Sequence, residues 1–436
     1  MLIRPLLAAL CALSTASASA QVRLPSLQLP QLPQLADPLN TPVLRDSGRR
    51  LLERSDIADL AGARLKRATE LLRQHPDVLE ADPHGEPAVR HEILAWSPSP
   101  AALAAARKAG LEVVSPADAD AATVVLRVPE QADTAAMLAR LRTLDPDGVY
   151  DYNHVYTGSA AQPMAQTEPT PGIRAPAAAP RAAGTLKVGL IDSGIARTHE
   201  VFSDAAIVPW GCDGAVHPAA HGTAVAALMI GHSERFHGVA PQAALYAADI
   251  YCDSATGGSA ARIAAALDWM AREQVAVINL SLVGPPNQIL ERVVAGMVKR
   301  GHLLVAAVGN DGPAAPPLYP ASYPGVVGVS GVDKRGKPLP EAARGPQVMF
   351  AAPGNQMVSA AIGSRPYATV RGTSFASPIV AALLADGLRQ PSPTAARQAL
   401  ADAAHKASGG TPGSQNNEIG YGVLGARYRI DPSEFQ

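Results

Sequence analysis

The chain has 436 residues, 17% of them charged, and a formal net charge of −1. This length accommodates one large domain and a smaller one. The balanced charge, without a long basic run, argues against a nucleic-acid partner.

Residues 1–20 predict a secretory signal peptide. Arg4 supplies a positive start, Leu6–Leu13 an apolar core and Ala18-Ser19-Ala20 a small-residue cleavage site. The apolar core is too short to span a bilayer, and no later segment reaches the roughly twenty apolar residues that a membrane helix needs. We therefore expect an exported protein, periplasmic or extracellular, without a membrane anchor.

Residues 21–86 predict a Pro-rich linker followed by a helical segment. The repeated Pro of residues 29–34 (Leu-Pro-Gln-Leu-Pro-Gln) excludes a regular helix and favours an extended linker. Between Arg45 and Gln74, apolar residues recur at helical spacing among Arg and Glu, which predicts one or two amphipathic helices. His75-Pro76 ends that pattern.

Residues 87–157 predict a small α+β domain. Strand-like and helix-like runs follow one another in the order β-α-β-β-α-β, the ferredoxin-like pattern. The predicted strands are 89–96, 111–114, 123–128 and 149–156, and the predicted helices are 98–109 and 133–144. Residues 158–183, rich in Ala, Pro, Gln and Thr, predict an unstructured linker of the kind in which proteolytic cuts concentrate.

Residues 184–430 predict a large α/β domain. Continuous apolar strands alternate with helical runs from Leu186 onward, which favours a parallel sheet covered by helices on both faces. Functional residues in such folds collect at the carboxyl ends of the strands. Asp192, Ser281 and Asn310 each follow a predicted strand and are therefore candidates for a site.

Two further motifs add a base and a nucleophile. His221-Gly222-Thr223 opens a predicted helix, and so does Ser374 in the segment Gly372–Pro378. A Ser at a helix N-terminus lies near N–H groups and the positive end of the helix dipole, which favour a developing oxyanion. On its own, Ser374 could equally be an N-cap, His221 a helix-start residue and Asp192 a turn residue.

With these motifs in the order Asp, His, Ser, the sequence resembles the subtilisin-like serine peptidases over roughly Gly184–Tyr428. The resemblance implies a subtilisin-like three-layer α/β fold with a mostly parallel central sheet, preceded by a small α+β ferredoxin-like pro-domain. It implies that Ser374 is the nucleophile, His221 its general base and Asp192 the residue that orients the imidazole. Asn310 matches the oxyanion-hole Asn of the family, with a turn residue as the alternative.

The resemblance also implies the walls of a substrate-binding cleft. The edge that pairs with a substrate backbone by strand addition is matched by three residues, Ser281, Leu282 and Gly284. Val283 stands where the family usually has Gly, and Gly257-Gly258-Ser259 matches the opposite edge. Leu318 either narrows the pocket for the residue on the acyl side of the bond, which favours small or medium apolar side chains, or packs within its own loop.

Two cysteines remain after removal of Cys11 with the signal peptide. Cys212 and Cys252 each lie just past a predicted strand, and the resemblance makes those strands neighbours. An oxidising compartment and an even count favour a disulfide, with two separate thiols as the alternative. No cofactor is expected and no metal site is predicted: family members often bind structural Ca²⁺, but no loop here is rich enough in oxygen ligands to be assigned one.

The sequence is therefore expected to encode an exported serine endopeptidase, made as a zymogen, that hydrolyses polypeptides through an acyl-enzyme. By resemblance, residues 87–157 are a pro-segment that assists folding and acts as an intramolecular inhibitor, with its tail in the cleft; an accessory domain is the alternative. We expect a monomer. The competing hypothesis is a non-catalytic or permanently inhibited scaffold that acts as a binding protein, but the presence of all four polar site residues favours the enzyme.

Overall fold

The computed structural model describes residues 62, 64–114, 122–158, 186–409 and 414–435. All of them belong to one compact unit, Leu51–Gln436. The predicted signal peptide, the Pro-rich linker and residues 159–183 of the predicted second linker lie outside the described residues. Within the described part of the chain, no helix combines the length and the apolar character needed to cross a bilayer.

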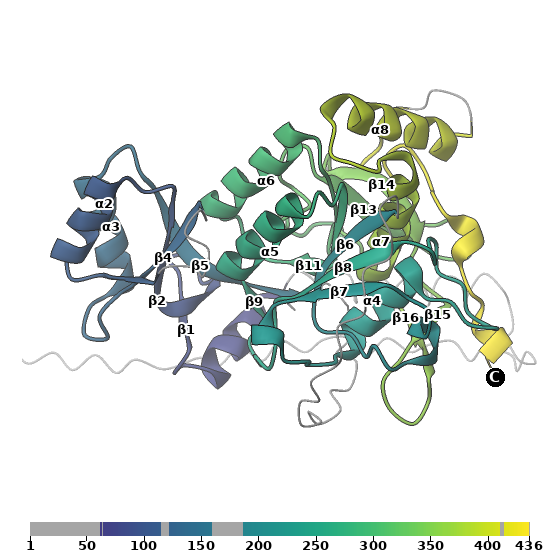
Figure 1. The fold of residues 1–436 in the computed structure, drawn as a ribbon, viewed down its shortest axis with the longest axis horizontal. Coiled ribbons are helices and arrows are strands. Elements are labelled where there is room, and N and C mark those ends of the chain that lie inside the picture. Colours follow the sequence, from purple (N-terminus) through teal and green to yellow (C-terminus); the bar gives the residue numbers. More distant parts are fainter. Residues whose placement is uncertain (1–61, 63, 115–121, 159–185, 410–413, 436) are drawn as a thin grey trace, which may run out of the picture. The chain divides into compact units, whose positions relative to one another are not determined.

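The large domain is built on a seven-stranded sheet in which every neighbouring pair of strands is parallel (Figure 1). Its strands read as nearly continuous apolar runs because both faces of the sheet are buried. In spatial order they are β14 (Val348–Pro353), β13 (Val327–Val332), β12 (Leu303–Ala307), β10 (Val277–Leu280), β6 (Lys187–Asp192), β8 (Ala244–Asp249) and β7 (Ile207–Trp210).

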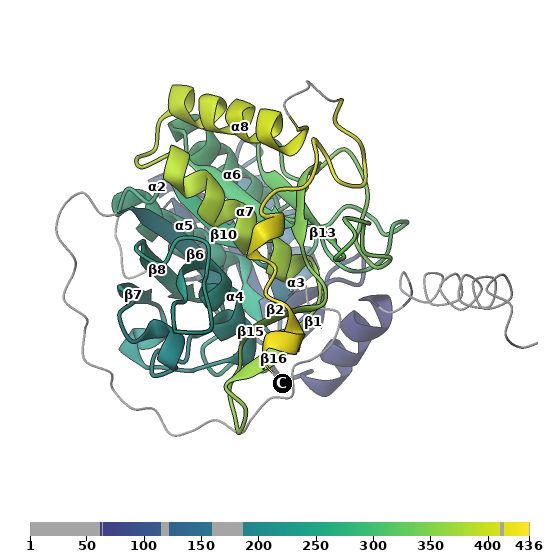
Figure 2. The same cartoon turned by 90° about the vertical axis from the view of Figure 1, so that its right-hand side faces the viewer.

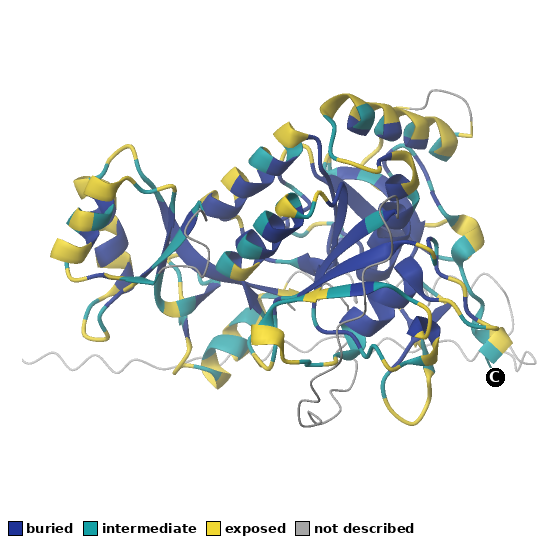
Figure 3. Cartoon of the chain, in the orientation of Figure 1, coloured by how far each residue is buried: buried dark blue, intermediate teal, exposed yellow. Residues whose placement is uncertain are grey.

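Helices cover both faces of this sheet, as the alternation of strands and helices predicts. Successive strand residues enter opposite cores: Leu303 packs with α4 (Ala220–Ile230), α7 (Thr373–Gly387) and α8 (Pro393–Ala407), whereas Leu304 packs with α5 (Ala260–Arg272) and α6 (Gln288–Arg300). Figure 2 shows α8 lying beside α7, and Figure 3 shows buried strands beneath helices whose outer faces are exposed. The predicted three-layer α/β fold is confirmed.

The small domain has the predicted ferredoxin-like order of elements. These are β2 (Pro87–Trp96), α2 (Pro100–Lys108), β3 (Glu112–Val114), β4 (Thr123–Arg127), α3 (Thr134–Leu144) and β5 (Val149–Gly158). Their strands pair antiparallel in the order β5-β2-β4-β3, and an apolar core lies between the sheet and the helices. The domain extends beyond its predicted limits, because β1 (Leu79–Ala81) pairs with β2 and because Gly158, predicted as linker, belongs to β5.

The last residues of β5 leave the small sheet and pair with the large domain. Residues 155–156 pair antiparallel with β9 (Gly258–Ser259), and residues 157–158 pair antiparallel with β11 (Leu282–Val283). The remaining elements are the hairpin β15 (Met357–Ala360) and β16 (Tyr367–Val370), a helix over residues 64–74, and short 3-10 turns at Glu200–Phe202, Cys212–Gly214, Ala426–Tyr428 and Pro432–Phe435.

Candidate active site

The four polar residues predicted to form the site lie on four different elements of the large domain. Asp192 ends β6, His221 lies in the first turn of α4, and Asn310 follows β12. Ser374 lies in the first turn of α7, whose N-cap is Gly372, so the alternative that Ser374 is itself the N-cap is wrong. Gly372 has a φ of +131°, a conformation that a residue with a Cβ rarely adopts, which explains the Gly before this helix.

Asp192 and His221 form the central hydrogen bond of the site. Nδ1 of His221 lies 2.8 Å from Oδ1 of Asp192, and because a carboxylate only accepts, Nδ1 carries the proton. The same Oδ1 accepts from the backbone N–H of Ser193 at 2.7 Å. The N–H of Gly222 donates to Ser193 Oγ at 3.0 Å, which ties the first turn of α4 to the end of β6. Nε2 of His221 is buried and has no hydrogen-bond partner among the described residues.

Opposing effects act on the imidazole. Burial by itself would lower the pKa of His221, but the charge of the Asp192 carboxylate and its hydrogen bond raise that pKa above the ordinary value of 6.5. A His with a raised pKa is a stronger proton acceptor. This environment suits a general base.

Asn310 is oriented by the helix that carries Ser374. Its Oδ1 accepts from the backbone N–H of Thr373 at 3.0 Å, while Thr373 Oγ1 accepts from the N–H of Gly309 at 3.3 Å. Because the amide oxygen is engaged in this way, Nδ2 points to the other side, where it is buried without a partner among the described residues. Thr373 was not among the predicted site residues, although its place directly before Ser374 points to such a role.

Ser281 directly follows β10, as predicted. Its side chain is buried, and its Oγ donates to the backbone carbonyl of Ser374 at 2.8 Å and lies 3.0 Å from Ser377 Oγ. It therefore fixes the first turn of α7 rather than lining the cleft with its side chain. Phe375, in the same turn, lies with its ring centroid 5.6 Å from that of His221, so α4 and α7 meet at the site.

The predicted edges of the cleft both hold the end of β5. Leu282 pairs with Gly158 and Val283 with Thr157 on one side, and Gly258 pairs with Tyr156 on the other. The backbone of the large domain thus adds an extended segment as an extra strand on both edges.

Gly284 and Gly158 lie where the end of β5 meets the large domain. A Cβ on Gly284 would lie 2.5 Å from the ring of Tyr156, so only Gly leaves room for that ring. Tyr156 is fully buried, and its hydroxyl donates to the carbonyl of Pro285 at 2.8 Å. At Gly158, a Cβ would lie 3.7 Å from Nε2 of His221, which places the end of β5 against the imidazole.

Leu318 is buried close to Asn310. Its Cδ1 lies 2.4 Å from where a Cβ of Gly309 would stand, so the side chain fills the space beside the residue that precedes Asn310. Leu318 therefore packs against Gly309, a residue outside its own loop.

The disulfide between Cys212 and Cys252 is confirmed, with Sγ atoms 2.10 Å apart. The preceding strands, β7 and β8, are parallel neighbours. Among the described residues, the one cluster of possible metal ligands is Cys212, Asp249 and Cys252, and the disulfide uses both of its sulfur atoms.

Comparisons with known proteins agree with this geometry. Residues 183–422, over half of the chain, match the model of the Subtilase family. The chain is 32% identical over 250 residues to the minor extracellular protease Epr of Bacillus subtilis (strain 168), covering 55% of this chain and 37% of that protein. It is 36% identical over 217 residues to subtilisin Savinase of Lederbergia lenta, covering 48% of this chain and 79% of that protein.

The M-protease of Shouchella clausii (strain KSM-K16) is 36% identical over 232 residues, 51% of this chain and 60% of that protein. The chain thus spans well under two thirds of the length of several relatives that it matches. Among solved structures, fervidolysin from Fervidobacterium pennivorans, a keratinolytic enzyme related to subtilisin, aligns with a TM-score of 0.64 and 18% identity. That alignment covers 80% of this chain and 62% of fervidolysin, which shows a shared fold.

Proposed function

The chain belongs to the subtilase family, and we propose that it is a serine endopeptidase with Ser374 as nucleophile, His221 as general base and Asp192 as the residue that orients the base. One observation carries this proposal. Nδ1 of His221 is held by Asp192 at 2.8 Å, while Nε2 is buried without a partner among the described residues and faces the cleft in which β5 ends.

The proposed reaction uses four side chains of the protein, the peptide substrate and one water molecule. His221 Nε2 takes the proton of the Ser374 hydroxyl as Oγ attacks the peptide carbonyl, and Asp192 stabilises the resulting imidazolium. Asn310 Nδ2 and the dipole of α7 stabilise the oxyanion. The imidazolium then protonates the leaving amine, and water, activated by the same base, hydrolyses the acyl-enzyme.

A peptide substrate would bind as β5 does. The edges β9 and β11 offer backbone groups to an extended chain, which gives affinity without selecting side chains. The side chain on the acyl side of the bond would face the space next to Gly309 that Leu318 partly fills. We therefore propose polypeptide substrates with a small or medium residue at that position.

We also propose that residues 87–157, with the neighbouring strand β1, form an inhibitory pro-segment. Its last strand occupies both edges of the cleft and ends against His221. Side chains of β5 also cap two helices of the large domain: Asp151 accepts from the N–H of Gln288 at 2.7 Å, and Asn153 from that of Ala261 at 3.0 Å. A substrate cannot occupy the cleft until this strand leaves.

We also propose that the protein is exported, on evidence separate from the active site. Residues 1–20 are typical of a signal peptide. The disulfide between Cys212 and Cys252 is of the kind that persists in oxidising compartments. One similar protein is named an extracellular protease.

The test is the intact mass of the purified protein before and after treatment with a fluorophosphonate, which labels an activated Ser. We expect the wild type to be shortened and to gain one adduct. Ser374→Ala should be neither shortened nor labelled. The control Ser364→Ala, at an exposed Ser, should be shortened and labelled like the wild type. A full-length, unlabelled wild type that cleaves no casein would instead favour the permanently inhibited scaffold.

A further inference from the structure

An ion pair lies between the segment that leads to Ser374 and the loop beside Asn310. Arg371, three residues before Ser374, binds the carboxylate of Glu341 twice: Nε lies 2.6 Å from Oε1, and Nη2 lies 2.7 Å from Oε2. The side chain of Glu341 is 7% exposed and that of Arg371 is 46% exposed, so the carboxylate is enclosed. Two parallel hydrogen bonds fix the orientation of the two groups as well as their separation.

The loop that carries Glu341 holds the chain on both sides of Asn310. The N–H of Ala343 donates to the carbonyl of Gly309 at 3.0 Å, and the N–H of Gly312 donates to the carbonyl of Glu341 at 2.9 Å. The residue before Asn310 and the second residue after it are therefore both bound to this loop. A displacement of the Glu341 loop would displace Asn310 with it.

The other partner, Arg371, belongs to the segment that begins α7. The next residue, Gly372, is the N-cap of this helix, and the N–H of Thr373 donates to Oδ1 of Asn310. The ion pair is thus a second connection between the start of α7 and the Asn310 loop. A single hydrogen bond leaves rotation about itself free, and a second connection removes that freedom.

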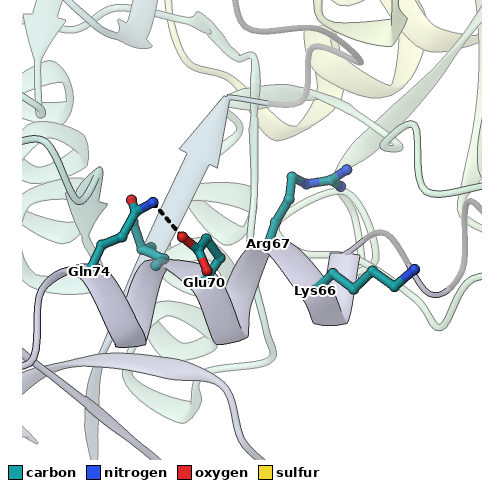
Figure 4. Close-up of a pocket in the computed structure, with 5 residues that line it drawn as sticks. Lys66, Arg67, Glu70 and Gln74 are labelled. Carbon is teal, nitrogen blue, oxygen red and sulfur yellow. Dashed lines mark hydrogen bonds between the residues drawn. The ribbon is translucent and has the colours of Figure 1, made fainter.

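Asp311, the residue after Asn310, has a partner of a different kind. It forms an ion pair with Arg67, which projects from the helix of residues 64–74 (Figure 4). That helix precedes the proposed pro-segment, so a cut after β5 would separate it from the chain of the large domain. Glu341 and Arg371 both belong to the large domain and stay in one chain after such a cut.

We propose that Glu341 and Arg371 are positioning residues of the peptidase, which act through the loop around Asn310 and hold its Nδ2 where the oxyanion forms. This inference rests on the proposed function, because its effect is measured as peptide hydrolysis. The oxyanion exists only in the transition state, so a displaced donor lowers kcat and leaves KM nearly unchanged.

The test compares variants of the self-processed protein on one peptide. Glu341→Gln keeps the shape of the side chain and removes its charge, whereas Arg371→Lys keeps the charge and loses the paired hydrogen bonds. We expect each change to lower kcat about tenfold with little change in KM, because a small misplacement of a catalytic group is costly. Active sites are counted by fluorophosphonate labelling, so that misfolded protein does not enter kcat.

The same changes in the Asn310→Leu background separate positioning from a general structural role. If the pair acts through Asn310, Glu341→Gln should cause no further loss of kcat in a protein that lacks the Asn310 amide. Glu418→Gln is the matched control, because Glu418 forms an ion pair with Arg344 at 2.7 Å and its side chain is 47% exposed. This control should leave kcat unchanged.

An unchanged kcat in Glu341→Gln and Arg371→Lys would overturn the proposal. The same loss in the Asn310→Leu background would also overturn it, since the pair would then act independently of Asn310, and so would an equal loss in Glu418→Gln. If Glu341→Gln yields no labelled protein, Arg371→Lys decides in its place. A wild type that is neither labelled nor active would count against the proposed function instead.

Discussion

At the scale of one residue, a substitution of Asn310 tests the proposed reaction. Thr373 holds its amide so that Nδ2 is free to meet an oxyanion, a charge that exists only in the transition state. Asn310→Leu should therefore lower kcat by about 10²–10³-fold, a loss of roughly 3–4 kcal/mol that is known for the corresponding donor in subtilisin. KM should change little.

The measurement is kcat and KM on one peptide, with the concentration of active sites counted by fluorophosphonate labelling. A variant in which KM rises while kcat is unchanged would show that Asn310 binds the ground state instead.

His221 sets the pH dependence of peptide hydrolysis. The imidazole must be unprotonated to act as a base, and Asp192 holds its pKa above 6.5 in spite of burial. Loss of the pro-segment reduces that burial and so weakens the effect that lowers the pKa of His221. The pKa therefore stays above its ordinary value in the processed enzyme. kcat/KM should therefore rise with pH, with a midpoint above 6.5.

Asp192→Asn removes the charge that raises the pKa. The residual activity of this variant should titrate at a lower pH than that of the wild type. A pH–rate profile with the same midpoint in both proteins would exclude His221 as the titrating base.

At the scale of elements, the sequence predicted what depends on local pattern. Continuous apolar runs such as Leu303–Ala307 predicted the parallel sheet, and the motifs around Asp192, His221 and Ser374 predicted where its polar edge lies. Two-residue strands have no periodicity of their own, so β9 and β11 could be inferred only from the resemblance.

Contacts between residues far apart in the sequence could not be predicted, because no local sequence pattern indicates them. The ion pair of Arg67 and Asp311 joins residues 244 positions apart. The side chain of Ser281 faces α7 rather than the cleft, because a buried hydroxyl is satisfied there by the carbonyl of Ser374.

Tyr156 is the residue through which strand β5 can be tested. It is fully buried and its hydroxyl donates to Pro285, so it anchors the proposed inhibitory strand to the large domain. Tyr156→Ala should shorten the delay between the first cut of the chain and the appearance of peptide hydrolysis. Tyr156→Phe should shorten it less, because one hydrogen bond is worth about 1 kcal/mol.

The matched control is Tyr150→Phe, since the hydroxyl of Tyr150 binds Asp145 inside the small domain. Both Phe variants lose one hydrogen bond, but only that of Tyr156 crosses to the large domain. Equal delays in Tyr156→Ala and the wild type would show that β5 does not limit activity.

At the scale of the whole molecule, the path of the chain predicts that the first cut is intramolecular. Gly158 already lies against His221, and the cleft edges hold the four residues before the undescribed segment. A bond so placed reacts within one molecule, without the cost of bringing two molecules together. The new N-terminus should lie within the first few residues after Gly158.

The half-time of this cut should therefore be the same at two protein concentrations a hundredfold apart, when followed by intact mass. Ser374→Ala should stay uncut on its own. Active wild type added to it should cut it only slowly, because the segment to be cut is held by β5 in the variant's own cleft. A half-time that shortens in proportion to concentration would mean that one molecule cuts another. In that case β5 would have to leave the cleft before any cut could occur.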